Sequence, residues 1–188
     1  MNEPIETASW GKKAPPHGEA PAIALVNPKY PNNVGMVVRL ASCYGLRQVW
    51  FTGDRVSLDP AAGERLPREE RMKGYRSVEM VRDDRVFDRF AAGTVTPVAV
   101  ELLPRAESLV TFEHPGDALY VFGPEDGGLP KPVRLLCHRF VVIPTHHCLN
   151  LAAAVNVVLY DRRLKRHLAG LEPLGPAGEM LREHRGPL

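Results

Sequence analysis

The sequence lacks a strong excess of charge of either sign. Its 24 basic and 22 acidic side chains give a net charge of +2, so no overall positive field indicates a nucleic-acid partner. The basic residues nevertheless comprise 18 arginines and only 6 lysines. Arginine suits bidentate contacts with phosphate, although a GC-rich genome would produce the same excess. The net charge therefore neither supports nor excludes RNA as a partner.

Long apolar runs and paired cysteines are also missing. No stretch approaches the roughly 18 consecutive apolar residues that a membrane span needs, and the first residues do not resemble a secretory signal. The three cysteines, Cys43, Cys137 and Cys148, are odd in number and show no C-x-x-C spacing. We therefore expect a cytoplasmic protein with reduced thiols and no membrane association.

A single domain is expected from the length of the chain and the distribution of proline and glycine. Prolines and few large apolar side chains suggest that residues 1–21 form a flexible arm, and residues 170–188 a C-terminal tail. Between them, residues 22–169 alternate short apolar runs with helical segments. This alternation predicts an α/β fold with a mostly parallel sheet and helices on both faces.

The expected elements can be placed along the chain. The strands are expected at residues 22–26, 48–51, 97–102, 118–122 and 140–143, and the long helices at about 33–44 and 148–168. Asn32 or Asn33 is expected to cap the first helix. The charged residues 59–92 are expected to be helical or irregular. The final helix is apolar nearly all the way round, which indicates a subunit interface.

Three loops that follow strands carry the candidate functional residues, because ligands of such sheets bind at the carboxyl ends of the strands. Residues 27–39 offer a helix start with a glycine for close backbone approach. Residues 122–130 form a rigid turn with three glycines, in which Glu125 and Asp126 could meet a ribose, an amine or a cation. Residues 143–150 lead into the last helix. A capped helix, an acidic surface turn and a backbone-lined pocket are the simpler structural alternatives.

The third loop contains His146, His147 and Cys148, which suggests zinc or a nucleophilic thiol. Adjacent residues cannot easily converge on one ion, and the spacings of zinc motifs are absent. A thiol at a helix start beside histidine would have a lowered pKa, but no oxyanion site or orienting partner is evident. We therefore predict no metal site, and expect the backbone of this loop to line a pocket.

In their order along the chain, the three loops resemble the three motifs of the SpoU (TrmH) branch of the SPOUT RNA methyltransferases. The first motif is similar to Asn33-x-Gly35-x-x-x-Arg39 and the second to F-G-P-E-x-x-G-L at residues 122–129. The third is similar to Ile143-Pro144 followed by L-N-L-A-A-A at residues 149–154. Cys148 departs from the pattern, because the family usually has serine there, and the loop before it is shorter than is common.

The resemblance implies an α/β fold with a C-terminal trefoil knot. It also implies S-adenosylmethionine as methyl donor, a ribose 2′-hydroxyl of RNA as acceptor, and a homodimer formed through the knot region and the final helix. The short chain is most similar to the minimal members that modify tRNA, so tRNA is favoured over rRNA. The implied catalytic residues are Arg39, Asn33, Glu125 and Asn150. The cofactor is implied to bind the backbone at Val100, Glu101, Gly123, Ile143, Cys148 and Leu149.

Roles for the basic residues follow from the same resemblance. Free arginine is protonated at any ordinary pH, so Arg39 is expected to bind the target phosphate and orient the hydroxyl, with direct base action as the alternative. Glu125 is expected to orient Arg39 or a ribose. RNA contacts are expected at Arg65, Arg68, Arg71, Lys73 and Arg76, although the glutamates among them also fit an exposed, salt-bridged helix.

Two other functions remain open from the sequence. A catalytically inactive RNA-binding or assembly protein could keep the knotted fold, and Cys148 motivates this alternative. An unrelated α/β enzyme could act on a nucleotide or small molecule through Glu125, Asp126 and the histidines. Affinity for the cofactor separates the first alternative from an active enzyme, and methyl incorporation into RNA separates the second.

Overall fold

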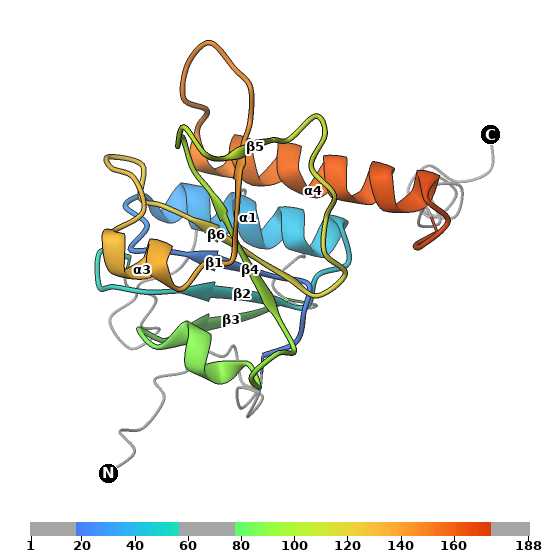
Figure 1. The fold of residues 1–188 in the computed structure, drawn as a ribbon. Helices are drawn as coiled ribbons and strands as arrows, with labels where there is room; N and C mark the ends of the chain where they lie inside the picture. Colours follow the sequence, from blue (N-terminus) through green and yellow to red (C-terminus); the bar gives the residue numbers. More distant parts are fainter. Residues whose placement is uncertain (1–17, 57–77, 174–188) are drawn as a thin grey trace, which may run out of the picture.

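Figure 1 shows the fold of the protein, a computed structural model that describes residues 18–56 and 78–173. The strands are β1 (Ala22–Leu25), β2 (Gln48–Phe51), β3 (Glu79–Arg82), β4 (Thr96–Val100), β5 (Glu107–Ser108), β6 (Ala118–Phe122) and β7 (Arg139–Val142). The helical elements are α1 (Pro31–Cys43), the 3-10 turn η2 (Val86–Arg89), α3 (Lys131–Leu135) and α4 (Leu151–Leu168).

The strands form one sheet in the order β3-β2-β1-β6-β4-β7-β5. Every pairing between them is parallel, as the strand–helix alternation predicted. The register pairs Phe122 at the end of β6 with Leu25 of β1 on one side and Val100 of β4 on the other. The loops that follow β1, β4 and β6 therefore leave the sheet side by side at its carboxyl edge.

Helical elements cover both faces of the sheet, which explains why β1 and β6 are apolar at every position. On one face, Ile23 and Tyr120 pack in a buried cluster with Val37 of α1 and Val155 of α4. On the other face, Trp50 packs in a second cluster that includes Val86 of η2, and Val133 of α3 packs against this cluster. The prediction of helices on both faces is confirmed, although the second face is covered by short elements.

The expected starts of both long helices were wrong. The helix α1 begins at Pro31, and its N-cap is Tyr30 without a side-chain cap. Proline pre-sets the first helical turn, which leaves the Asn33 amide inside the helix to bond elsewhere. The last helix begins at Leu151, not at Cys148, because the Asn150 side chain accepts from the N–H groups of Ala152 and Ala153 and so fixes the helix start.

The segment at residues 59–92 was expected to be helical or irregular, but it contains β3 as an edge strand. Only Met80 and Val81 of β3 are buried. The strand is four residues long with two apolar positions, so its sequence pattern was too weak to predict a strand.

The arginine-rich stretch at residues 65–76, most of the N-terminal arm and most of the C-terminal tail lie outside the described residues. The predicted domain limits remain predictions. At the start of the tail, Glu172 forms ion pairs with Arg162 and Arg166 of α4.

Candidate functional site

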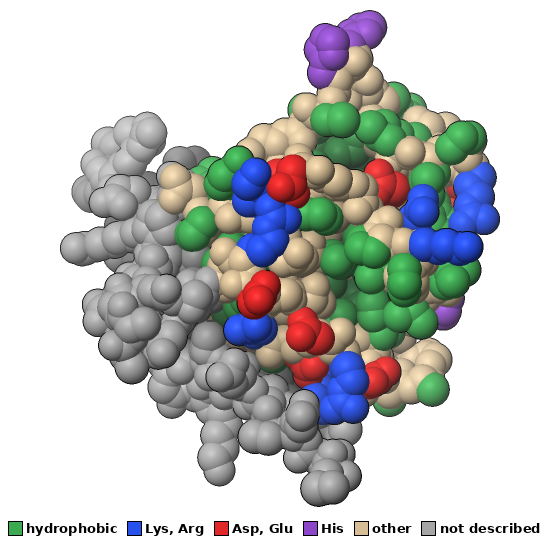
Figure 2. Space-filling model, turned by 90° about the vertical axis from the view of Figure 1, so that its left-hand side faces the viewer, with side chains coloured by type: hydrophobic (Ala, Val, Ile, Leu, Met, Phe, Trp, Pro, Cys, Tyr) green, Lys and Arg blue, Asp and Glu red, His purple; other side chains and the backbone are tan. Residues whose placement is uncertain are grey.

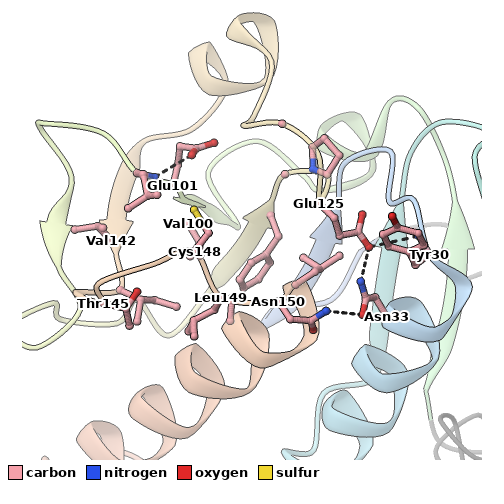
Figure 3. Close-up of a pocket in the computed structure, with 18 residues that line it drawn as sticks. Tyr30, Asn33, Val100, Glu101, Glu125, Val142, Thr145, Cys148, Leu149 and Asn150 are labelled. Carbon is pink, nitrogen blue, oxygen red and sulfur yellow. Dashed lines mark hydrogen bonds between the residues drawn. The ribbon is translucent and has the colours of Figure 1, made fainter.

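A chain of side-chain hydrogen bonds joins the first, second and third predicted motifs at the carboxyl edge of the sheet. The Asn33 side-chain N–H group donates to Glu125 Oε1 at 2.6 Å. The Asn150 side-chain N–H group donates to Asn33 Oδ1 at 3.0 Å. Three residues that the sequence singled out for one site are therefore in direct contact (Figure 3).

Glu125 also holds the loop that follows β1. Its carboxylate accepts from the backbone N–H of Lys29 at 2.7 Å and from that of Tyr30 at 3.4 Å. With the Asn33 amide, this carboxylate has three donors, all from the segment that opens α1. Glu125 was expected to orient Arg39 or a ribose, but in this structure it orients Asn33 and the backbone at residues 29–30.

Beside this chain, two cations share the carboxylate of Asp126. Arg55 donates to both of its oxygens at 2.9 and 2.7 Å, and Lys29 Nζ lies 3.3 Å from one of them. The hydrogen bonds from Arg55 lower the pKa of Asp126 to about 2, so the carboxylate is charged at any ordinary pH. This cluster carries one net positive charge at the rim of the site. Figure 2 faces the same edge of the sheet and shows basic and acidic side chains interspersed there.

A cavity of about 280 Å³ opens next to the hydrogen-bonded chain. Asn33, Glu125, Tyr30 and Asn150 lie at one end of it, and Val142 and Glu101 at the other (Figure 3). All six predicted cofactor positions line the cavity: Val100, Glu101, Gly123, Ile143, Cys148 and Leu149. Of the described residues that line it, only Glu101 and Glu125 carry a charge, and both are acidic. The cavity therefore suits a ligand with positive charge and an apolar part.

The Glu101 side chain is a feature that the sequence reasoning missed, since only the backbone of this residue was singled out. Its carboxylate accepts from the N–H of Leu129 at 2.5 Å and from the N–H of Leu102 at 2.9 Å. A Cβ on Gly128 would lie 2.8 Å from this carboxylate, and a Cβ on Gly123 would lie 3.0 Å from the Leu129 nitrogen. The glycines thus allow the turn after β6 to close onto Glu101. An acidic residue directly after a strand was the only signal for it.

Arg39 does not line the cavity. It is exposed on α1, and six residues place it about 9 Å along the helix from Asn33. Within residues 18–56 and 78–173 its side chain has no hydrogen bond or ion pair, so its predicted contact with the ligand mouth remains a prediction. In the same part of the chain no three His, Cys, Asp or Glu side chains gather as a metal ion would need, and no helix is long and apolar enough to cross a membrane.

The parallel sheet, the three loops at one edge and the acidic cavity define a class of α/β protein with a ligand site at its strand ends. The SpoU rRNA Methylase family model matches residues 20–160, which is most of the chain. The chain therefore belongs to this family, as the three loops indicated.

Two curated relatives show how far the similarity extends. The tRNA (cytidine-2′-O-)-methyltransferase TrmJ of Methanocaldococcus jannaschii is 27% identical over 164 residues, covering 77% of this chain and 68% of that protein. An uncharacterized tRNA/rRNA methyltransferase of Synechocystis is 27% identical over 169 residues, covering 84% of this chain and 58% of that protein. The chain thus spans about two thirds or less of the length of these relatives.

Solved structures share the fold. The TrmH/SpoU tRNA modifying enzyme of A. aeolicus matches with a TM-score of 0.69 at 16% identity, covering 86% of this chain and 85% of that one. An AdoMet-bound rRNA methyltransferase of Sinorhizobium meliloti matches with a TM-score of 0.63 at 22% identity, covering 84% of this chain and 62% of that one. These matches confirm the α/β fold with a mostly parallel sheet.

Proposed function

We propose that this protein transfers a methyl group from S-adenosylmethionine (AdoMet) to a ribose 2′-hydroxyl of RNA, with tRNA as the substrate. The observation that carries the proposal is the hydrogen-bonded chain Glu125–Asn33–Asn150, which unites the three family motifs at the rim of one cavity. Membership of the SpoU family supports the reaction type. The name of the TrmJ relative supports the ribose 2′-oxygen and tRNA.

The residues of the cavity fit AdoMet. Apolar side chains such as Val100, Ile143 and Leu149 can cover an adenine ring, and the glycine at position 123 lets the ligand approach the backbone closely. The sulfonium group is cationic, so the two acidic side chains favour it over an anionic cofactor. Cys148 lines the same cavity, and contacts through its backbone do not depend on whether the side chain is a thiol or a hydroxyl.

When bound, AdoMet would supply an activated methyl group for the ribose hydroxyl, which has to give up its proton. The chain must place the ribose and assist the departure of that proton. Asn33, fixed by Glu125 and Asn150, offers a rigid polar group at the mouth of the cavity. We assign to Arg39 the binding of the target phosphate, because an always-protonated guanidinium suits a phosphate in bidentate geometry.

We extend the proposal to a homodimer. One face of α4 packs on α1, but Val157, Tyr160, Leu164 and Leu168 remain exposed on its other face. They recur every three or four residues and so form a stripe along the helix. A second copy of the chain would cover this stripe, as the apolar composition of the helix indicated. The trefoil knot that the family resemblance implies also belongs to the proposal.

The test is methylation of RNA by the purified protein. Bulk tRNA and rRNA from cells that lack this gene are incubated with AdoMet carrying a labelled methyl group, then digested to nucleosides and analysed by mass spectrometry. We expect a 2′-O-methylated nucleoside from tRNA. Asn33→Ala should lose most of this activity, whereas Asn32→Ala should retain it, because the neighbouring Asn32 is exposed and does not line the cavity.

Other outcomes would contradict the proposal in distinct ways. A labelled base in place of a labelled ribose would refute the 2′-hydroxyl as acceptor, and label in rRNA alone would refute the choice of tRNA. Calorimetry with AdoMet separates the remaining alternative, because an inactive RNA-binding protein that keeps the fold need not bind the cofactor.

A further inference from the structure

An aromatic side chain lies at one end of the cavity. Tyr30 is the N-cap of α1 and lines the cavity, yet 49% of its surface is exposed. Its backbone is fixed by the N–H bond to Glu125 and by α1, whose first turn begins at the next residue. An exposed tyrosine on a fixed backbone at a ligand mouth offers a flat ring that loses little freedom when a ligand covers it.

The Lys29 side chain places a positive charge near the Tyr30 ring. Lys29 Nζ lies 5.2 Å from the centroid of the Tyr30 ring and 3.3 Å from Asp126. Arg55 pairs with Asp126 through two hydrogen bonds, and the nearby Glu125 carboxylate accepts from three N–H groups, so Lys29 is the cation that lies at the ring. A flat aromatic face beside an ammonium group matches the two parts of a nucleotide, since bases stack on aromatic rings and phosphates attract ammonium groups.

The ring stands apart from the end of the cavity that suits the cofactor. Figure 3 shows Tyr30 beside Glu125 and Asn33, with Glu101 and Val142 at the far end. The Tyr30 end contains the residues assigned to the chemistry, and the Tyr30 side chain is itself exposed, so a macromolecular substrate can reach it there. Adenine of the cofactor would lie instead against apolar side chains such as Val100, Ile143 and Leu149.

We propose that Tyr30 and Lys29 form the subsite for the RNA nucleotide that is methylated, with its base stacked on the Tyr30 ring and a flanking phosphate on Lys29. This inference rests on the proposed RNA methyltransferase function. A base can lie on the ring only when it has left its own stack and pair. The target is therefore an unpaired nucleotide, in a loop or flipped out of a helix.

The experiment compares variants of Tyr30 with tRNA from cells that lack this gene. Tyr30→Ala should raise the KM for tRNA about tenfold and leave the Kd for AdoMet, measured by calorimetry, within twofold of the wild-type value. Tyr30→Phe keeps the ring and should behave as wild type. Tyr30→Leu keeps an apolar side chain without a π face and should resemble Tyr30→Ala, which separates stacking from a loss of packing.

The cation is tested through salt dependence. Lys29→Ala should reduce the slope of log affinity for tRNA against log salt concentration by about one phosphate contact. Lys131→Ala, an exposed lysine on α3, should leave the slope unchanged. Ultraviolet cross-linking of the wild-type complex, followed by mass spectrometry, should place a nucleotide on the peptide that contains Tyr30.

The outcomes distinguish this inference from the function on which it rests. If the wild-type protein methylates tRNA but Tyr30→Ala has the wild-type KM, the subsite is wrong and the function stands. A change in the Kd for AdoMet with an unchanged KM for tRNA would also overturn the subsite. If the wild-type protein methylates no RNA, the proposed function itself fails.

Discussion

Asn33 illustrates how a single side chain can serve both structure and site. Its amide is nearly buried, and both its oxygen and its nitrogen are occupied, by Asn150 and Glu125 respectively. A buried amide that lost either partner would incur a desolvation cost of about 1–3 kcal/mol. The fixed orientation of Asn33 is therefore a property of three loops together.

Arg39 carries the sharpest prediction at the scale of single residues. Arg39→Ala should lower kcat for methyl transfer by a factor of about 100 or more. The Kd for AdoMet should remain unchanged, because the residue lies outside the cavity. Steady-state kinetics and calorimetry measure the two quantities separately.

Arg47→Ala is the matched control for this variant. Arg47 is an exposed arginine just beyond α1, and among the described residues its side chain forms an ion pair of 3.8 Å with Glu19, so its removal should leave the activity intact. Weakened AdoMet binding in Arg39→Ala, with kcat preserved, would show that Arg39 belongs to the cofactor site and that our assignment is wrong.

At the scale of elements, the carboxyl ends of the strands position the residues of the site. The sequence was sufficient to place β1, β2 and β6 correctly, because their apolar runs are bounded by polar turns. It did not reveal β3 or β5, since Glu79–Arg82 and Glu107–Ser108 are short and mostly polar. Edge strands of this kind form because a neighbouring strand pairs with them, and the sequence of the edge strand alone does not show that a neighbour is present.

The turn after β6 depends on Glu101 at the end of β4, which leads to a second prediction. Hydrogen bonds to a charged acceptor contribute about 1.5–3 kcal/mol, so Glu101→Ala should loosen this turn and raise the Kd for AdoMet about tenfold. Glu101→Gln, which keeps one acceptor oxygen, should fall between this variant and the wild type.

Calorimetry provides the measurement, and Glu113→Ala provides the control, because Glu113 is exposed and does not line the cavity. Equal affinities in Glu101→Ala and the wild type would mean that the turn holds its shape without the carboxylate.

At the scale of the whole molecule, the exposed stripe on α4 gives the third prediction. A glutamate at position 164 would place a charge in the proposed dimer interface, so Leu164→Glu should convert the dimer into a monomer. Sedimentation velocity reports the mass directly. Leu135→Glu changes an equally apolar side chain on α3, exposed by 74%, and should leave the dimer intact. A wild-type protein that sediments as a monomer would refute the interface.

Residues far apart in sequence were assigned to one site through motif order, and the structure places Asn33, Glu125 and Asn150 within hydrogen-bond distance. The residue types alone could not predict which of these side chains form hydrogen bonds with each other. Asn32 or Asn33 was expected to cap a helix because asparagine often does so, but the helix begins earlier, at Pro31. The side-chain roles of Glu101 and Tyr30 depend on loops that meet only when the sheet has formed, so no spacing in the sequence reveals them.

The bonds that define the site join residues 92 and 117 positions apart in the chain. Closing such long segments is entropically costly and slow, and the site also depends on the parallel pairings of β1 with β6 and of β6 with β4. A nascent or partly folded chain therefore has no binding site for AdoMet. Occupancy by the cofactor would report completed folding and, by mass action, would shift the folding equilibrium toward the native state.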